Sequence, residues 1–335
     1  MMRPDDTDIL TLKSLSIGYG NEKPLISGID LHMRPGELVA LIGRNGSGKS
    51  TLIRSVTGIL PLLAGECSLG GIPLHAMSPR RRARKVSYVS AGVGQAPPMR
   101  VRELASLGRM PYTGWRGKLR KRDIELVDRA IGAVQLQEMA DRTLDQLSDG
   151  ERQRAMIARA LVQDAPLMVL DEPTAFLDMA HQYELTRMLT EFREQGKAIL
   201  YSTHDLESAL MVADRLWVIT QSGIREGAPE DLGMEGIFDT LFRHSGITFD
   251  VDTRRFRRSV RIRGMMRLNG KETLALAWTR NALERLGYEV REEAENEVRV
   301  VLSVENKRQW VLIREQGRET FDSIGSMARF LIEEN

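Results

Sequence analysis

Short apolar runs alternate with longer stretches of helical period between about residue 35 and residue 220 of the chain. Three of the runs, Glu37 to Ile42, Leu167 to Leu170 and Ala198 to Tyr201, end directly at polar residues. Buried parallel strands that alternate with helices give this α/β pattern. Open α/β sheets bind ligands at the carboxyl ends of their strands, so we predict that the polar residues after the three runs share one site.

The segment before this core has a different period. Leu10 to Ile17 and Ile26 to Met33 alternate apolar and polar residues, which predicts an antiparallel β subdomain. Tyr19 is expected on the loop between the two strands.

A smaller α+β segment is predicted at the end of the chain. It starts with an arginine-rich stretch, Arg254 to Arg267, and contains two strand-like runs, Val298 to Val304 and Trp310 to Ile313. Two further stretches carry one apolar stripe each, made of Ala275, Trp278, Ala282 and Leu286, and of Phe321, Ile324, Ala328 and Leu331. We therefore expect two domains, residues 8–250 and 251–335, and the second has no catalytic or metal-binding pattern of its own.

Composition narrows the class of protein. With 335 residues, 28% charged and 42% hydrophobic, the chain has the composition of a soluble globular protein, and its apolar runs are too short to cross a bilayer. The amino-terminal residues lack the pattern of a secretory signal, and one cysteine, Cys67, excludes an internal disulfide, so we expect a cytosolic location. A formal net charge of +2 argues against nucleic-acid binding by bulk charge.

The residues after the first of the three runs fit the phosphate-loop pattern, and a predicted helix begins near Lys49. Glycines let successive backbone N–H groups converge on a β-phosphate, with the positive end of the helix macrodipole behind them. Lys49 is predicted to neutralise the β- and γ-phosphates, and the hydroxyl of Ser50 to ligate Mg²⁺. The predicted nucleotide-binding residues here are Gly43, Arg44, Asn45, Gly46, Ser47, Gly48, Lys49, Ser50 and Thr51.

Two carboxylates and a histidine follow the other two runs. Asp171 is the candidate Mg²⁺ ligand, and Glu172 is the candidate general base that polarises the attacking water. His204 follows the third strand and is predicted to contact the γ-phosphate and the water from the opposite side.

A second anion site is predicted where Ser148, Asp149, Gly150 and Glu151 begin a helix. Ser148 and Glu151 form a capping box, and a capped helix amino end with an exposed N–H group also binds anions. Since one phosphate loop already serves the nucleotide, this element is surplus within one chain. We therefore expect it to act on the nucleotide of a second subunit.

Taken in this order, the motifs resemble those of the ATP-binding cassette (ABC) ATPases over residues 8–250. The resemblance implies a P-loop core with an antiparallel β subdomain and a helical subdomain. It also implies a head-to-tail homodimer in which each ATP lies between the phosphate loop of one subunit and the signature, residues 148–151, of the other. Tyr19 matches the aromatic residue that stacks on adenine, and Asp178 matches the loop that crosses the dimer interface.

The chain departs from the family pattern at two places. The signature has Asp149 and Glu151 where the most frequent form has Gly and Gln. The added negative charge is expected to weaken the binding of a phosphate by the signature. The glutamine usual after the strand Val86 to Val89 is replaced by Ser90-Ala91-Gly92. Gln95 is the candidate substitute, and whether it takes that place stays open.

A narrower resemblance is to the ATPases of importers for ferric siderophores, haem and cobalamin. It rests on two segments, Val101-Arg102-Glu103-Leu104 and Gly108-Arg109-Met110-Pro111-Tyr112. It implies an ATP-hydrolysing subunit, peripheral on the cytoplasmic face of the cytoplasmic membrane, with integral membrane permease subunits as direct partners. An extracytoplasmic substrate-binding protein is an indirect partner.

Two alternatives remain at this stage. A soluble ABC ATPase acting on nucleic acid or ribosomes would use the arginines at 80 to 82 and 254 to 263, and a steep salt-dependent affinity for RNA or DNA would favour it. The carboxyl-terminal segment is either a regulatory module that binds a ligand or protein, or a passive support for packing and dimerisation.

Overall fold

The computed structural model describes residues 8–20, 23–91, 98–114, 116–175, 177–242, 247–250, 255–258, 262–270, 273–291, 301–306, 309–314 and 317–333. These residues form two compact units, one ending at Leu241 and the other made of the described residues from Phe242 onward.

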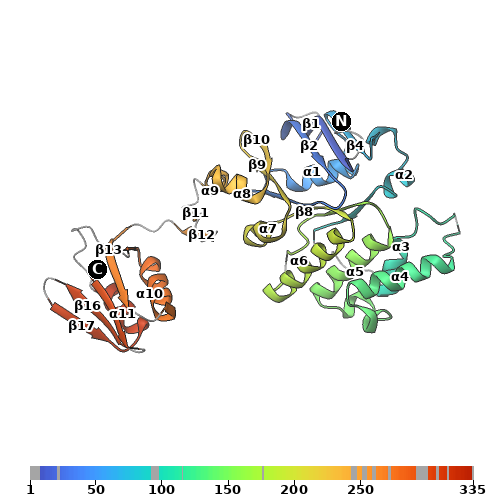
Figure 1. The fold of residues 1–335 in the computed structure, drawn as a ribbon. Helices are drawn as coiled ribbons and strands as arrows, with labels where there is room; N and C mark the ends of the chain where they lie inside the picture. The colour runs from blue at the N-terminus through green and yellow to red at the C-terminus, as the bar shows by residue number, and fades with distance from the viewer. Residues whose placement is uncertain are drawn as a thin grey trace. The chain divides into compact units, whose positions relative to one another are not determined.

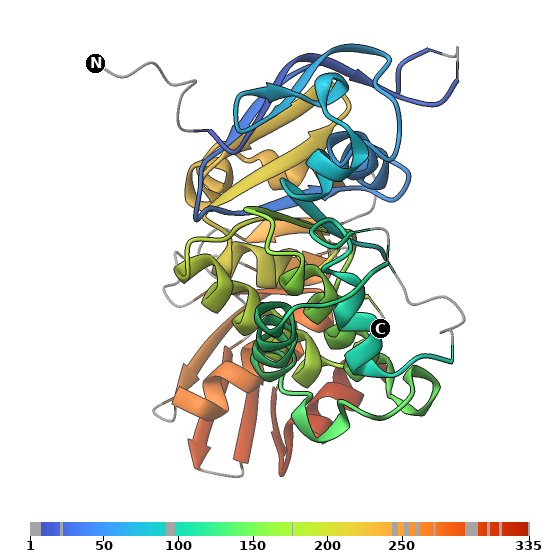
Figure 2. The same cartoon turned by 90° about the vertical axis from the view of Figure 1, so that its right-hand side faces the viewer.

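The first unit begins with a four-stranded antiparallel sheet in the order β2-β1-β4-β5. Its strands are β1 (Leu10–Ile17), β2 (Ile26–Met33), β4 (Ala64–Leu69) and β5 (Ile72–Pro73). The first two have the bounds expected from their alternation, because their apolar positions face the core. In Figures 1 and 2 this sheet lies at one end of the unit, coloured blue.

A six-stranded sheet in the order β10-β9-β3-β8-β7-β6 forms the centre of the first unit. Its strands are β3 (Leu38–Gly43), β6 (Val86–Val89), β7 (Leu167–Leu170), β8 (Ala198–Ser202), β9 (Arg215–Thr220) and β10 (Gly223–Gly227). All neighbouring pairs are parallel except that of β10 with β9. Because β8 lies between β3 and β7, the three strands whose ends carry the predicted chemistry are adjacent.

Helices cover this sheet and extend beyond it. They are α1 (Lys49–Val56), α2 (Pro79–Ala83), α3 (Val101–Leu107), α4 (Lys121–Ala133), α5 (Asp149–Val162), α6 (Met179–Glu194), α7 (Leu206–Val212), α8 (Pro229–Met234) and α9 (Ile237–Phe242). The green helices α3 to α6 gather at the end opposite the antiparallel sheet (Figures 1 and 2). None of the helices in the described part of the chain is long and apolar enough to span a membrane.

The Gly108-Arg109 segment joins three of these helices. A Cβ on Gly108 would lie 2.3 Å from the carbonyl oxygen of Arg159 in α5, so only glycine allows this close approach. The buried Arg109 donates to the Asp123 carboxylate in α4 at 2.8 Å and to the Val162 carbonyl in α5 at 3.1 Å. These contacts fix the packing of the helical subdomain.

The second unit contains a hairpin and a mixed five-stranded sheet in the order β14-β13-β15-β16-β17. Its elements are β11 (Ile247–Asp250), β12 (Arg255–Arg258), β13 (Gly264–Gly270), α10 (Thr273–Arg285), β14 (Tyr288–Arg291), β15 (Val301–Asn306), β16 (Gln309–Arg314), β17 (Gly317–Phe321) and α11 (Ile324–Glu333). A domain boundary at residue 250 would divide the β11–β12 hairpin.

A separate apolar core holds the second unit together. Ala328 and Leu331 of the expected final stripe are buried in it. The stripe expected on α10 is wrong at Trp278, which is 62% exposed, because α10 turns Thr279 and Leu283 inward instead. The Thr279 hydroxyl accepts a hydrogen bond from Trp310 Nε1 at 2.7 Å, which satisfies the one polar atom of that buried ring.

Candidate functional site

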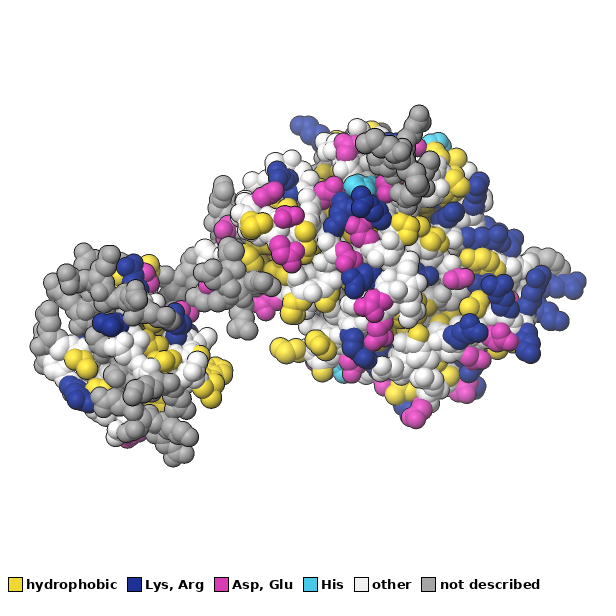
Figure 3. Space-filling model, in the orientation of Figure 1, with side chains coloured by type: hydrophobic (Ala, Val, Ile, Leu, Met, Phe, Trp, Pro, Cys, Tyr) yellow, Lys and Arg dark blue, Asp and Glu magenta, His cyan; other side chains and the backbone are white. Residues whose placement is uncertain are grey.

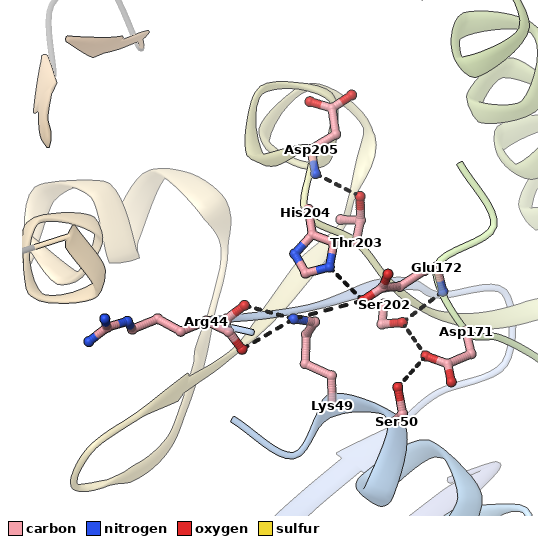
Figure 4. A network of polar contacts seen from close by, with 10 residues as sticks. Arg44, Lys49, Ser50, Asp171, Glu172, Ser202, Thr203, His204 and Asp205 are labelled. Atoms are coloured by element: carbon pink, nitrogen blue, oxygen red, sulfur yellow. Dashed lines mark hydrogen bonds and ion pairs between the residues drawn. The ribbon is translucent and has the colours of Figure 1, made fainter. Parts of the chain in front are cut away.

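The loop after β3 wraps around the side chain of Lys49. Gly46 and Gly48 have φ angles of 76° and 105°, which glycine adopts without strain. A Cβ on Gly43 would lie 2.6 Å from Ser47 Oγ, so the loop is also too tight for a larger residue there. Lys49 Nζ donates to the Gly43 carbonyl at 2.8 Å, and Arg44 contributes only its carbonyl, at 3.4 Å, with its guanidinium directed away (Figure 4).

Lys49 has little contact with solvent. Its side chain is 5% exposed and Nζ lies 4.0 Å from Glu172 Oε1. Burial lowers the pKa of Lys49 below its usual value, and the carboxylates of Glu172 and Asp171 oppose that shift. A buried ammonium with two carboxylates nearby is suited to receive the charge of a polyphosphate.

Ser202, the last residue of β8, ties the two strand-end carboxylates together. Its buried hydroxyl donates to Asp171 Oδ1 at 2.8 Å and accepts from the Glu172 backbone N–H at 2.9 Å. Ser50 Oγ donates to the same Asp171 oxygen at 3.0 Å. The backbone of Glu172 has a φ of 47°, in the left-handed region, and the bond from its N–H to Ser202 helps to hold that conformation. The network in Figure 4 therefore spans three neighbouring strand ends.

His204 contacts the second carboxylate directly. Its Nε2 lies 2.6 Å from Glu172 Oε1, and the imidazole is about half exposed. The turn that carries it is fixed on its far side, where the Asp205 N–H donates to Thr203 Oγ1 at 3.0 Å and the Asp205 side chain caps α7. His204 and Glu172 therefore point toward one another (Figure 4).

A cavity of about 780 Å³ opens beside this network. Its lining consists of Gly18, Tyr19, Lys23, Pro24, Leu25, Asn45, Gly46, Gly48, Lys49, Ser50, Thr51, Glu172 and His204. Tyr19, expected from the sequence to stack on a base, is 53% exposed and its hydroxyl accepts from Thr51 Oγ1 at 3.3 Å. An aromatic ring and a lysine in one cavity suit a ligand with a flat base and a polyphosphate.

The oxygen atoms of Ser50 and Asp171 fit a magnesium ion. Asp171 is 1% exposed, and its Oδ2 has no hydrogen-bond partner among the described residues. A carboxylate oxygen, the Ser50 hydroxyl and phosphate oxygens form the hard donor set that Mg²⁺ prefers. A cation bound to Asp171 Oδ2 would account for the missing hydrogen-bond partner of that oxygen.

The signature residues do not line this cavity. Ser148 caps α5, with its Oγ accepting from the Glu151 N–H at 3.3 Å, and the Glu151 carboxylate accepts from the Ser148 N–H at 2.8 Å. That backbone hydrogen bond is the main reason why the pKa of Glu151 lies below its usual value. Asp149 forms a 3.5 Å ion pair with Arg152. Both carboxylates at this helix end are therefore engaged in local contacts.

His181, on the first turn of α6, contacts the signature helix α5, and sequence reasoning missed it. His181 Nδ1 lies 2.7 Å from Asp178 Oδ1, and the ring lies against Gly150, where a Cβ would be 3.1 Å from it. Asp178 caps α6 through the His181 N–H at 2.9 Å. The expected dimer loop and the signature are thus coupled within one chain.

Ser202 was also missed, and Gln95 is not located. The only sequence signal for Ser202 was a hydroxyl at the end of an otherwise apolar strand, two residues before His204. Gln95, the candidate replacement for the missing glutamine, lies outside the described residues.

Two family models match the chain. Residues 26–175 match the ABC transporter family, and residues 263–332 match the iron ABC transporter C-terminal domain. The achromobactin transport ATP-binding protein of Dickeya dadantii is 35% identical over 235 residues, which is 70% of this chain and 87% of the relative. The petrobactin import ATP-binding protein of Bacillus anthracis is 36% identical over 233 residues, 69% and 85% of the two chains. The ferric enterobactin transport ATP-binding protein of Escherichia coli is 32% identical over 232 residues, 69% and 85%.

Solved structures share the fold. A metal-chelate type ABC transporter in an inward-facing conformation aligns with a TM-score of 0.63 at 23% identity, over 70% of this chain and 89% of that one. A bacterial ABC transporter cassette solved as a dimer aligns with a TM-score of 0.57 at 24% identity, over 66% and 98%. The expected fold class, a P-loop ABC ATPase core, is confirmed. The chain belongs to the family of ABC transporter ATP-binding proteins, the subunits that hydrolyse ATP in these transporters.

Proposed function

We propose that the cavity beside Lys49 binds MgATP. In this proposal Tyr19 stacks on adenine, the phosphate loop with Lys49 and Thr51 binds the phosphates, and Ser50 and Asp171 hold the magnesium ion. The unpaired Oδ2 of Asp171 and the buried ammonium of Lys49 support these roles. Bound Mg²⁺ would neutralise charge on the phosphate oxygens.

Glu172 is proposed as the general base and His204 as its orienting partner. The 2.6 Å contact between them holds one carboxylate oxygen, and the other, which has no hydrogen bond or ion pair to the described residues, would polarise a water that attacks the γ-phosphorus. In a bound complex His204 would also contact the γ-phosphate. Ser202 is proposed as a positioning residue, since it fixes both Asp171 and the backbone of Glu172 without reaching the cavity.

The signature, Ser148 to Glu151, is proposed to bind the γ-phosphate of ATP held by a second copy of the chain. Its residues line no part of their own cavity, and this observation carries the proposal of a head-to-tail homodimer. Asp178, coupled to Gly150 through His181, would form the loop that crosses between subunits. ATP binding would close the dimer and hydrolysis would reopen it.

The transported compound is proposed to be an iron chelate, a siderophore or haem, or cobalamin. Relatives that import achromobactin, petrobactin and ferric enterobactin support the siderophore, and so does the match to the iron ABC transporter C-terminal domain. Subunits of this family work with membrane permeases. We place this one at the cytoplasmic face of the cytoplasmic membrane, with an extracytoplasmic substrate-binding protein as an indirect partner.

The division of labour along the chain is also a proposal. Residues 8–250 would form the ATP-binding domain, and residues 251–335 an accessory domain. Deleting residues 264–335 and measuring the ATPase rate and dimerisation would distinguish a regulator, whose removal changes either quantity, from a passive extension.

Co-purification and reconstitution test the proposed transport. The chain should leave native membranes together with an integral permease, and proteoliposomes of the complex should take up a ferric siderophore only with MgATP. The Glu172→Gln complex, matched to a Glu207→Gln control at an exposed position on α7, should bind ATP and transport nothing. Recovery of the chain with ribosomes or RNA and without an integral partner would contradict the proposal.

A further inference from the structure

Positive charge is distributed unevenly along this nearly neutral chain. Residues 67–122 contain thirteen Lys and Arg against a single carboxylate, Glu103, whereas the whole chain has a net charge of only +2. The remaining residues are therefore net acidic. A local excess of this size creates a strong field at one face of a protein and attracts an anionic partner.

The structure attaches one basic run of this segment to the loop that leads into the other. Arg80 on α2 donates to the carbonyls of Pro111 and Thr113 at 2.9 and 2.6 Å, and Arg84 donates to the Pro111 carbonyl at 2.8 Å. These bonds attach α2 to the loop that leads into the second run at the start of α4. We call six exposed cations of the two runs the basic edge: Arg80, Arg81, Arg84, Lys118, Lys121 and Arg122. Figure 3 shows dark blue side chains gathered on the side of the first unit that carries α2 and α4.

Within the part of the chain that the structure describes, no carboxylate neutralises the basic edge. None of its six side chains forms an ion pair with a carboxylate of the described residues, whereas the nearby Arg102 and Arg109 are paired with Asp128 and Asp123. Lys118, Lys121 and Arg122 have no role in the nucleotide site described above. Their charge is available to a partner.

Apolar side chains are exposed beside these cations. Met110, next to the Pro111 carbonyl that Arg80 and Arg84 bind, is 65% exposed, and Ile124 on the first turn of α4 is 47% exposed. Cations that surround exposed apolar side chains are typical of surfaces that lie on a bilayer. Single-stranded nucleic acid instead needs an open aromatic face. Among the described residues of this loop the aromatic ring is that of Tyr112, and the guanidiniums of Arg109 and Arg84 cover it, at 3.9 and 4.9 Å.

We propose that the basic edge binds the anionic lipid headgroups of a membrane surface. Clusters of four to eight cations bind such surfaces, and each contributes about a fivefold gain in affinity. The proposal depends neither on the transported compound nor on ATP hydrolysis.

Vesicle sedimentation of the full chain without nucleotide tests this. The protein should bind vesicles that contain phosphatidylglycerol, bind pure phosphatidylcholine vesicles much less, and dissociate as salt is raised. The variant K118Q/K121Q/R122Q should lose roughly a hundredfold in affinity for the anionic vesicles. The control R34Q/R285Q/R329Q, which removes the same charge from exposed positions elsewhere, should keep the wild-type affinity.

Three results would overturn the proposal. Equal binding to both kinds of vesicle would remove the role of lipid charge, and an equal loss in the control would show that only net charge matters. Tighter binding of duplex RNA than of anionic vesicles at the same salt would assign the basic edge to nucleic acid. ATP binding by the triple variant, measured alongside, distinguishes a lost surface from a lost fold.

Discussion

Two helices of this protein present their amino ends to phosphate in different ways. Helix α1 has Gly48 as its cap, with no side-chain hydrogen bond and no acidic residue in its first turn. Helix α5 is capped by Ser148 and has two carboxylates, Asp149 and Glu151, in its first turn. The amide groups of α1 stay free for an external anion, whereas one amide of α5 is already bound by its own side chain.

This difference assigns the two helix ends to two separate steps, nucleotide binding by one subunit and closure of the dimer. Since α1 faces the cavity of its own chain, it governs how tightly a single subunit binds nucleotide. A carboxylate in the first turn stabilises a helix by about 0.3–1 kcal/mol and opposes a second anion by a similar amount. We therefore expect α5 to add a weaker contact that matters only when two subunits meet.

The largest effect is expected for Glu172→Gln. Loss of the base should lower the hydrolysis rate about 10²- to 10⁴-fold, while α1 and Lys49 still bind ATP, so that an ATP-stabilised dimer accumulates on gel filtration. The control is Glu207→Gln, an exposed carboxylate on α7. Full turnover in Glu172→Gln would reject the assignment of the base.

Ser148→Arg should disturb the contact made by α5 and leave nucleotide binding at α1 intact. A bulky side chain at the cap of α5 should weaken ATP-dependent dimerisation by about thirtyfold or more and leave ATP binding by single subunits unchanged. Calorimetry for nucleotide and light scattering for the dimer measure the two quantities. Ser222→Arg, at an exposed turn, is the matched control. A loss of nucleotide affinity in single Ser148→Arg subunits would show that the signature acts on the nucleotide of its own chain, against the proposal.

Ser202→Ala tests the hydrogen bonds that position Asp171 and Glu172 in the nucleotide site. Loss of the hydroxyl leaves the Glu172 N–H without a partner and leaves Asp171 Oδ1 with Ser50 alone, which should cost about 1–3 kcal/mol of stability and lower kcat about tenfold with little change in KM. Ser202→Thr, which keeps a hydroxyl, should restore kcat. Ser55→Ala removes an equally buried hydroxyl on α1 that has no partner among the described residues, and it should leave kcat unchanged.

The smallest effect is expected for Glu151→Gln. Glutamine keeps the capping box and removes the charge, so ATP-dependent dimerisation should tighten about two- to fivefold. Because the pKa of Glu151 is lowered in the folded chain, its contribution to stability is complete at neutral pH and is lost as pH falls through that lowered value. Wild type should therefore lose more stability in acid than Glu151→Gln, and parallel acid-unfolding curves would contradict this.

Much of this architecture was readable from local sequence. The alternation at Leu10 to Ile17 and the apolar run at Leu167 to Leu170 predicted their strands, because period and burial are local properties of a chain. The phosphate loop was predicted because its glycines and lysine are contiguous. The role of Ser202 was not, since it depends on β8 lying between β3 and β7, and sheet order is not written in any one segment. Trp278 was misplaced because a helical stripe of apolar residues does not say which face the sheet covers.

The central claim is that each ATP is held by Lys49 of one subunit and Ser148 of the other. Two variants, Lys49→Ala and Ser148→Arg, each in a Glu172→Gln background that prevents turnover, should trap no ATP in a dimer when purified alone. Mixed together, they form a dimer with one intact composite site, and gel filtration with labelled ATP should find one nucleotide per dimer. The account would be contradicted if Ser148→Arg alone trapped ATP in a dimer, or if the mixture of two folded variants trapped none.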